Sequence, residues 1–366
     1  WWFSKRQYLI DIGVDGFNTD GGEFVFGKDF LFANGQKGSE MRNQYPNDYV
    51  KAYYEFAQQN EGMTFSRAGY TGAQNFPAHW AGDERSTFAA FKRSLIAGLN
   101  SGLSGVVFWG WDLAGFNGDI PTAELYMRST AMAAFCPIMQ YHAESKGEFN
   151  QDRTPWNIAE RTGHDEVIDV YRFFANVRMN LIPYIYSQSV KSSTTGLPLM
   201  RALMIEYPED QRVYGIYDEY LFGDDLLVAP IIEEGALTRK VYLPEGTWFN
   251  LWTKEKIQGP AFIEVPALFS EIPVFVKGNR ALLFNLDQTK QLGSSVGNDV
   301  TTYDTPVCKI FYHEDFEQTI FDHLGNEVKL SVKKIKDTLQ ITSESSFKQL
   351  EIKVFGTDDD IVIEHV

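Results

Sequence analysis

The chain has 366 residues, a net charge of −16, 44% hydrophobic residues and 22% charged residues. This balance excludes a disordered chain, and at ~100–200 residues per domain it predicts two or three domains. The acidic excess argues against nucleic acid or an anionic membrane as a partner, because both carry negative charge. No apolar run approaches the ~18 residues that a membrane-spanning helix needs. A neutral substrate is compatible with this composition.

Cysteine and histidine usage points away from disulfides and metals. Cys136 and Cys308 lie far apart, which is no disulfide framework, and the six histidines show no zinc-binding spacing. We therefore expect no metal and no organic cofactor. The absence of an Asn-x-Ser/Thr acceptor disfavours a glycosylated secretory protein and favours a cytoplasmic one. Aromatic residues make up 15% of the chain, which suits sugar binding but is explained more simply by core packing.

The first half of the chain alternates short apolar segments with longer helical ones, as far as about Glu206. Such strand-then-helix units predict a parallel sheet covered by helices. The predicted strands are 14–19, 64–66 and 105–109. The predicted helices are 4–12, 45–59, 87–99, 123–135 and 165–187.

After about Pro208 the pattern changes to short strands separated by turns, which predicts two small all-β modules. Pro-Glu-Gly at 244–246 and the acidic run 358–360 are predicted to be turns. The predicted strands are 226–232, 239–243, 272–276, 307–312, 328–332, 339–342 and 350–354. The predicted domains are a catalytic α/β domain at 1–207, a proximal β-domain at 208–290 and a distal β-domain at 291–366.

Two carboxylates are candidates for catalysis. Asp20 ends a predicted strand and is followed by Gly21, Gly22 and Glu23. The carboxyl ends of parallel strands form the active-site edge of α/β folds, and small residues let a substrate approach closely. Glu23 could orient Asp20. The alternative is a strand-to-helix turn in which Asp20 acts as a cap.

The second carboxylate, Asp83, stands three residues after Trp80, with Gly82 between them. An aromatic ring can bind a sugar face and remove water from a neighbouring acid, as general acid catalysis requires. The alternative is an N-cap for the helix that follows. Two carboxylates on neighbouring loops suggest glycoside hydrolysis, which needs one acid and a second carboxylate near the anomeric carbon.

Three further polar residues follow predicted apolar segments: Arg67, Asp112 and His142. Each has a structural alternative, namely an ion pair, a loop turn and a hydrogen-bonded structural histidine. Together with Asp20 and Asp83 they form five polar positions in five successive units. Chance capping residues would not be expected to fall in this way, so the pattern favours one shared rim.

Four blocks resemble glycoside hydrolase family 31, which contains α-glucosidases and α-xylosidases. They are GVDGFNTDGGE (13–23), SRAGYTGAQNFPAHWAGDERSTF (66–88), FWGWDLAGF (108–116) and YLFGDDLLVAP (220–230). The resemblance implies that Asp20 is the nucleophile and Asp83 the acid/base. It implies that the sugar subsite is lined by Arg67, Trp80, Asp112, Phe116 and His142, with Glu23 and Trp109 in support. The family fold is a (β/α)8 TIM barrel followed by two small β-sandwich domains.

Two departures from the family pattern concern the sugar specificity of the pocket and the completeness of the barrel. Asn18 and Gly21 stand where α-glucosidases carry bulkier residues, which predicts a roomier and more polar pocket. The family nucleophile follows barrel strand four, so we expect strands four to eight here and the earlier part of the barrel elsewhere. The missing N-terminal part of the same enzyme is then the expected partner. Alone, the chain should be unstable or inactive, and a homo-oligomer is possible.

The sequence thus predicts a retaining α-glycosidase that acts on an oligosaccharide or α-glycoside, with α-glucosides favoured. An α-xylosidase, an α-N-acetylgalactosaminidase, a transglycosylase or a lyase would share these residues. An inactive carbohydrate-binding fragment is the alternative from another class. Retention predicts carboxyl groups ~5–5.5 Å apart, against ~6.5–9.5 Å for inversion.

Overall fold

The computed structural model describes residues 1–366 except 145–150, 299–302, 304–305, 345–346, 348–349 and 366. Within the described residues, the first half builds a four-stranded parallel sheet in chain order. Its strands are β1 (Gly16–Thr19), β2 (Met63–Ser66), β3 (Ala78–Trp80) and β4 (Phe108–Gly110). The predicted sheet is therefore confirmed, with β4 shifted toward the C-terminus and β3 lying before Asp83, where a strand was expected without stated bounds.

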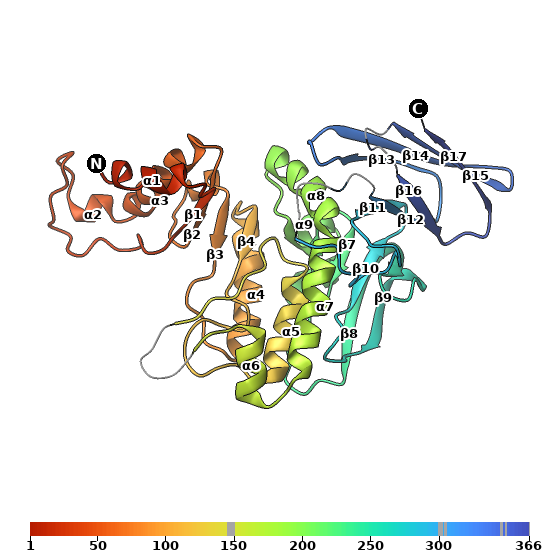
Figure 1. Ribbon diagram of the computed structural model, residues 1–366, viewed down its shortest axis with the longest axis horizontal. Helices are drawn as coiled ribbons and strands as arrows, with labels where there is room; N and C mark the ends of the chain where they lie inside the picture. The colour runs from red at the N-terminus through yellow and green to blue at the C-terminus, as the bar shows by residue number, and fades with distance from the viewer. Residues whose placement is uncertain (145–150, 299–302, 304–305, 345–346, 348–349, 366) are drawn as a thin grey trace.

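The helices divide into two groups along this sheet (Figure 1). Beside β1 and β2 lie α1 (Gln7–Asp11), α2 (Gly38–Met41) and α3 (Gln44–Gln58), which together form the N-terminal lobe. The larger group is α4 (Phe88–Leu103), α5 (Ala123–Ala133), α6 (Pro155–Thr162), α7 (Glu166–Asn180), α8 (Ile182–Thr195) and α9 (Leu203–Glu206). Threonine caps α4, α5 and α6, since each Thr hydroxyl accepts a backbone N–H from the first turn.

Two expectations for the first half are wrong. The helix predicted over 165–187 is two helices, because Pro183 lacks a backbone N–H and falls at the start of α8 after the break at Leu181. The fifth strand expected before His142 is, among the described residues, an isolated parallel bridge between Asp112 and Gln140. The part of the barrel expected to hold strands four to eight thus shows four strands and this bridge.

The second half opens with a sheet in the order β5-β6-β7-β10-β8-β9. Its strands are β5 (Met200–Ala202), β6 (Tyr220–Phe222), β7 (Leu226–Val228), β8 (Thr238–Asn250), β9 (Lys256–Pro266) and β10 (Val274–Lys277). The turn predicted at 244–246 is wrong: this segment lies inside β8, where the pairing with β9 shifts register between Leu243 and Gly246. A bulge lets the chain bend there without ending the strand.

Two further sheets complete the described part of the chain. One contains β11 (Arg280–Phe284), β12 (Val307–Phe311) and β16 (Glu351–Phe355). The other contains β13 (Phe316–Phe321), β14 (Glu327–Ile335), β15 (Thr338–Glu344) and β17 (Asp360–His365). The domain boundaries expected at 207 and 290 stay a prediction. β5 lies before the first boundary but pairs with β6, which lies after it. β11 lies before the second boundary but pairs with β12, which lies after it.

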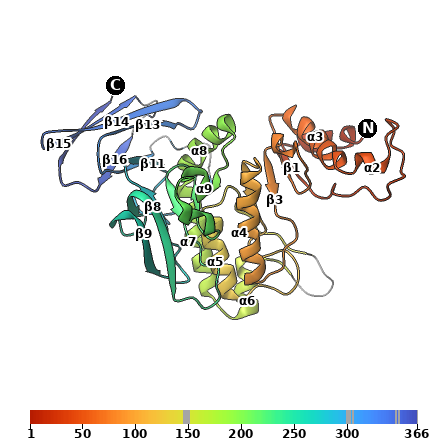
Figure 2. The same cartoon turned by 180° about the vertical axis from the view of Figure 1, so that it is seen from behind.

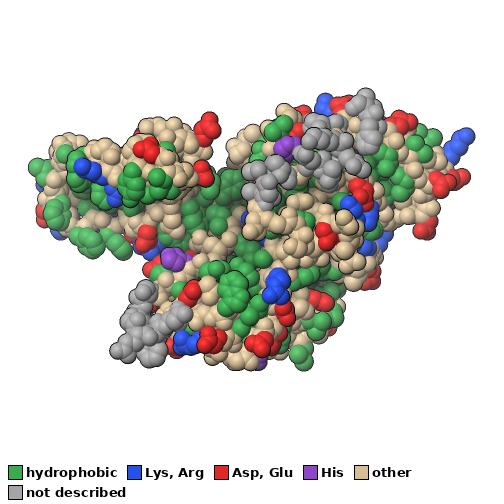
Figure 3. Space-filling view, in the orientation of Figure 1, with side chains coloured by type: hydrophobic (Ala, Val, Ile, Leu, Met, Phe, Trp, Pro, Cys, Tyr) green, Lys and Arg blue, Asp and Glu red, His purple; other side chains and the backbone are tan. Residues whose placement is uncertain are grey.

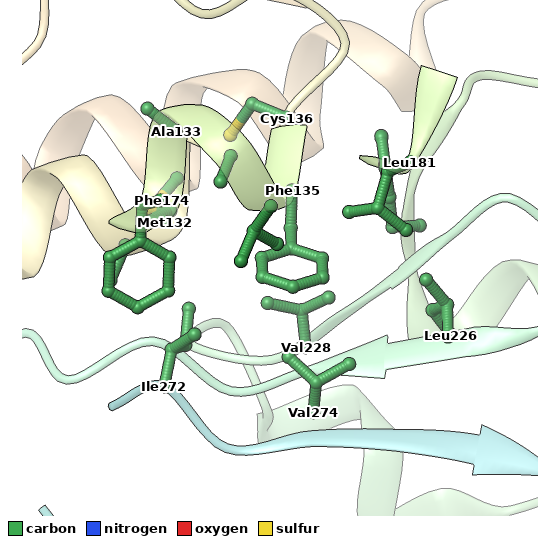
Figure 4. Packing of buried hydrophobic residues seen from close by; sticks show 14 of the residues in the cluster. Met132, Ala133, Phe135, Cys136, Phe174, Leu181, Leu226, Val228, Ile272 and Val274 are labelled. Carbon is green, nitrogen blue, oxygen red and sulfur yellow. The ribbon is translucent and has the colours of Figure 1, made fainter. Parts of the chain in front are cut away.

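The principal hydrophobic core joins α5 and α7 to the sheet that follows them (Figure 4). Phe135 and Phe174 are fully buried there against Val228 of β7 and Val274 of β10. Cys136 belongs to this core and Cys308 to a separate cluster in the last two sheets; both are free and buried. The barrel segment and the β-modules are therefore packed into one body.

The N-terminal lobe is less enclosed. From behind, it joins the rest of the molecule chiefly through β3 and the loops around it (Figure 2). β1 is an edge strand, and the segment after it carries Phe24, Phe26, Phe30 and Leu31 with most of their side-chain surface exposed. An open strand edge beside exposed aromatic residues is what an incomplete barrel would present.

Candidate active site

Asp20 follows β1 directly, and its environment is built by glycine and tyrosine. The Gly21 N–H donates to Asp20 Oδ1 at 3.0 Å, and Tyr49 Oη of α3 donates to the Asp20 carbonyl at 2.7 Å. Gly22 has φ near 87°, and a Cβ on it would lie 2.4 Å from the Tyr49 ring. The second glycine is therefore required for the Tyr49 contact, which fixes the backbone of Asp20.

Arg67 follows β2 and joins the two candidate carboxylates. Its Nη1 lies 2.9 Å from Asp20 Oδ1 and 3.0 Å from Asp83 Oδ1, and its Nε is paired with Glu23. The hydrogen bond that Arg67 donates to Glu23 is the main cause of the raised pKa of Arg67. The two Oδ1 atoms that Arg67 bridges therefore lie within about 5.9 Å of each other, the sum of the two distances. This bound concerns the two bridged oxygens and is compatible with the ~5–5.5 Å between carboxyl groups that is typical of retaining enzymes.

Asp83 lies in the loop after β3, three residues beyond the buried Trp80. Trp80 contacts Phe65 at a ring-centroid distance of 5.1 Å and lies 5.9 Å from the Arg67 guanidinium. We expected Trp80 to remove water from Asp83, but the Asp83 side chain is 47% exposed. The contact that it makes instead is the ion pair with Arg67.

The burial expected at Asp83 is found at Asp112, after β4. Asp112 is 2% exposed, and burial, assisted by the nearby charge of Asp83, raises its pKa to about 7. Gln140 Nε2 donates to Asp112 Oδ1 at 2.9 Å and partly opposes this shift. A buried carboxyl group aimed at this rim can bind sugar hydroxyl groups in either protonation state.

Phe116 and His142 complete the rim. Their rings meet edge to face at a centroid distance of 5.1 Å, and Phe116 N donates to the Glu84 carbonyl at 2.8 Å. Trp109 lies apart from them: a Cβ on Gly98 of α4 would lie 2.8 Å from the indole, so the ring packs against that helix. Its contribution is to the sheet–helix contact and not to the rim.

Three residues at this rim were not foreseen. Tyr49 and Gln140 hold Asp20 and Asp112 as described above, and Asn117 Nδ2 donates to the Asp83 carbonyl at 2.9 Å. No motif marks them, because each acts through a backbone or an amide contact from a distant segment. The tyrosines spaced four apart at 45, 49 and 53 were the only available signal, since such spacing places them on one helix face.

Neither a metal centre nor a membrane span is found in the described part of the chain. No group of three or more His, Cys, Asp or Glu side chains there could hold a metal ion. Within the same residues, no helix is both long and apolar enough to cross a bilayer.

Comparison with known proteins identifies the family. Residues 1–188 match the glycosyl hydrolases family 31 TIM-barrel domain, and 196–282 match the glycosyl hydrolase family 31 C-terminal domain. The chain belongs to glycoside hydrolase family 31. Its members are glycosidases and related glycosyl-transferring enzymes, so the resemblance seen in the sequence is confirmed.

Individual relatives show which members of the family the chain resembles. An isomaltosyltransferase of Sporosarcina globispora is 44% identical over 96% of this chain and 33% of its own length. A cycloalternan-forming enzyme of Listeria monocytogenes, solved with a pentasaccharide substrate, has a TM-score of 0.88 and 44% identity over 92% of this chain and 32% of its own. A cycloalternan-degrading enzyme of Trueperella pyogenes, solved with a covalent intermediate, has a TM-score of 0.73 and 43% identity over 76% and 39%. The family 31 chain thus spans about a third of the length of these relatives.

Proposed function

We propose that the complete protein containing this chain cleaves α-glucosidic bonds by double displacement with retention of configuration. The observation that carries the proposal is the Arg67 bridge, which keeps the Asp20 and Asp83 oxygens within about 5.9 Å of each other. Such a close approach fits the ~5–5.5 Å carboxyl separation of retaining enzymes better than the ~6.5–9.5 Å of inverting ones. The covalent intermediate in the Trueperella pyogenes relative supports the same chemistry.

The two carboxylates have separate tasks in this mechanism. Asp20 attacks the anomeric carbon and forms a glycosyl-enzyme ester, while Asp83 gives a proton to the leaving oxygen. Asp83 then takes a proton from water or from an acceptor hydroxyl, which attacks the ester and releases Asp20. Arg67 pairs with both residues and with Glu23, so one positive charge lies between the two carboxyl groups and reduces their mutual repulsion.

The subsite follows from the rest of the rim. Trp80 and Phe116 offer aromatic surface for a sugar ring, and Asp112 and His142 offer polar atoms for its hydroxyl groups. Asn18 and Gly21 place little side-chain bulk beside the nucleophile. Small residues at these positions suit a glucose that carries a further sugar, which fits relatives named isomaltosyltransferase and 1,3-alpha-isomaltosidase.

We therefore infer an α-glucan donor with an isomaltosyl end, transferred either to water or to a sugar hydroxyl. Both outcomes use the same residues and differ in the acceptor. The polypeptide that completes the barrel is the proposed partner, because the relatives are about three times as long and β1 is an open edge. Without that segment we expect the chain to bind and turn over its substrate poorly.

The test is a variant series in the complete polypeptide. Asp20→Ala and Asp83→Ala should each lower kcat on an α-glucosyl substrate by ~10²–10⁴ or more, because each removes one step of proton or covalent catalysis. Asp48→Asn, which changes an exposed carboxylate of α3 that contacts Gln44, is the matched control and should retain activity. Wild-type activity in Asp20→Ala would overturn the nucleophile assignment.

Product analysis separates the alternatives. Incubation with an isomaltosyl-ended oligosaccharide should give free isomaltose if water is the acceptor, or longer or cyclic saccharides if a sugar hydroxyl is. A lyase would give a product one water lighter, which mass spectrometry detects. Saturable sugar binding without turnover would favour a carbohydrate-binding protein and would contradict the proposed activity.

A further inference from the structure

A buried arginine lies behind the loops that carry the acid/base candidate and part of the subsite. The Asp83 loop is 81–87, after β3, and the Asp112 loop is 111–119, after β4. We propose that Arg153 is a positioning residue for Asp83, which it holds in place by fastening these two loops together. The inference rests on the proposed function, because it assumes that Asp83 protonates the leaving oxygen.

The two loops are already joined through their backbones. The N–H groups of Phe116 and Asn117 both donate to the Glu84 carbonyl, at 2.8 and 3.0 Å. Asn117 Nδ2 donates to the carbonyl of Asp83 itself at 2.9 Å. Gly115 has φ near 94°, and a Cβ there would lie 2.6 Å from the backbone carbon of Arg85. The position of the Asp83 backbone therefore follows that of the Asp112 loop.

Arg153 bonds to both loops with one guanidinium. Its Nη2 donates to Ser86 Oγ of the Asp83 loop at 3.0 Å and to the Asp119 carbonyl of the Asp112 loop at 3.2 Å. The carbonyls of Gly118 and Gly115 accept from Nη2 and Nε, each at 3.3 Å. The planar fork of arginine makes such several-sided contact possible, and a lysine ammonium cannot reproduce its geometry.

The arginine is itself fixed to the core. Its side chain is 0% exposed, and Tyr126 Oη of α5 donates to its carbonyl at 2.7 Å. Thr154, the next residue, caps α6. Burial lowers the pKa of Arg153, and the nearby Asp119 and Asp152 act in the opposite direction. The guanidinium thus connects the helical core to the site without touching the rim itself.

This arrangement predicts a selective defect. Within the part of the chain that the structure describes, Asp20, Arg67 and Glu23 make no hydrogen bond or ion pair with Arg153, whereas Ser86 of the Asp83 loop does. Loss of Arg153 should let Asp83 move relative to the leaving oxygen. Substrates whose leaving group needs a proton should then suffer, and substrates with a leaving group that departs unprotonated should not.

The experiment compares two substrates in the complete polypeptide. Arg153→Met should lower kcat/KM for an isomaltosyl-ended oligosaccharide by ~10–100-fold but for α-glucosyl fluoride by less than ~3-fold, because fluoride leaves without general acid help. Arg153→Lys should fall between the variant and wild type. If Arg153→Met does not fold, Ser86→Ala removes only the hydroxyl that Arg153 contacts. This variant should lose kcat/KM on the oligosaccharide and not on the fluoride, by a smaller factor than Arg153→Met.

Arg128→Met is the matched control. Arg128 is also buried, at 2% exposed, and its Nη2 donates to the Ala236 carbonyl at 2.9 Å, on α5 and away from both loops. It should cost stability but lower activity on the two substrates equally. Amide hydrogen exchange at Phe116 and Asn117 should quicken in the Arg153 variants and not in this control.

The outcomes separate this inference from the proposed function. Equal losses on the two substrates in Arg153→Met, or unchanged exchange at Phe116 and Asn117, would overturn the positioning role. Absence of turnover in the wild-type complete protein would instead overturn the proposed function. The exchange measurement would still decide whether Arg153 fastens the two loops.

Discussion

Strands β1 and β4 are the two edges of one parallel sheet, yet the aspartates that follow them lie in opposite surroundings. Asp20 after β1 is 71% exposed and pairs with Arg67, whereas Asp112 after β4 is 2% exposed and accepts from Gln140. Position after a strand places a carboxyl group at the rim. The packing on either side then decides whether that group is open to solvent or is buried, as at Asp112, where burial raises the pKa to about 7.

The same contrast extends to the packing behind each strand. Helices α4 and α5 bury the β4 side in the principal core, while on the β1 side hydrophobic side chains gather on the outside of the N-terminal lobe and in the hollow beside it (Figure 3). The chain therefore presents one enclosed wall at the β4 side and one open wall at the β1 side. Stability and activity should respond differently to changes in the two walls.

The largest effect on stability is expected when one phenylalanine is replaced in each of the two regions. Phe135→Ala should lower the free energy of unfolding of this chain by ~3–5 kcal/mol, because it opens a cavity in the core. Phe26→Ser, at 75% exposed, should change it by less than ~0.5 kcal/mol. Urea unfolding followed by far-UV circular dichroism measures both.

The control and the sharper form of this comparison use the complete polypeptide. Leu237→Ser, at an exposed position of the second half, should match Phe26→Ser in the isolated chain. In the complete protein Phe26→Ser should cost more than ~1 kcal/mol, since a covering segment would bury the ring. Equal costs for Phe26→Ser in the two settings would contradict the open-wall interpretation.

Much of the β4 side and of the rim could be predicted from sequence, and the reasons are local. The run at 105–109 is apolar and flanked by glycine, and the carboxylates follow such runs directly, so strand and rim position are readable without tertiary knowledge. The block motifs added the roles of Asp20 and Asp83, which remain proposals here. The relative burial of Asp83 and Asp112 could not be predicted, because it depends on Gln140 and Arg67 arriving from other segments.

The failures have the same origin. Strand β8 continues through Pro-Glu-Gly because β9 pairs with it on both sides of a bulge, and only the partner strand decides this. Trp109 is of a residue type that suits a sugar-binding site, but the alternation of side chains along β4 turns its ring toward Gly98 of α4. Arg153 carries no motif and became visible only through the two loops that it joins.

A smaller effect should appear at Asp112 and should depend on pH. Folding raises the pKa of Asp112 from an ordinary value of 3.8 to about 7, so the folded state holds this proton more tightly than the unfolded state. The resulting destabilisation is absent below about pH 4, grows as the pH rises, and is complete above about pH 7. Asp112→Asn keeps an acceptor for Gln140 and removes the titration.

We therefore expect Asp112→Asn to be more stable than wild type at pH 8.5 by ~1–3 kcal/mol and nearly equal to it at pH 4.5. Urea titrations of the chain at the two pH values test this. Glu219, another buried carboxyl group whose pKa burial raises to about 8, is present in both proteins and cancels in the difference. A stability difference of the same size at both pH values would show that Asp112 does not titrate as described.

The smallest effect is expected at the contact that positions Asp20. Tyr49→Phe removes the hydrogen bond to the Asp20 carbonyl and keeps the ring that packs over Gly22. Burial raises the pKa of Tyr49 to about 12, so the hydroxyl stays a donor throughout a normal assay range. One such bond contributes ~1 kcal/mol, which corresponds to a ~5-fold lower kcat in the complete protein if the contact fixes the nucleophile.

Tyr54→Phe is the control for this last change, because Tyr54 is also on α3 but its hydroxyl contacts Gln58. It should leave kcat unchanged. If Tyr49→Phe lowers kcat/KM for α-glucosyl fluoride and for an oligosaccharide alike, the defect lies in attack by Asp20, because kcat/KM covers the steps up to the glycosyl-enzyme and fluoride leaves without a proton. A loss confined to the oligosaccharide would place the effect on the Asp83 side and would contradict a role for Tyr49 in holding the open wall of the site.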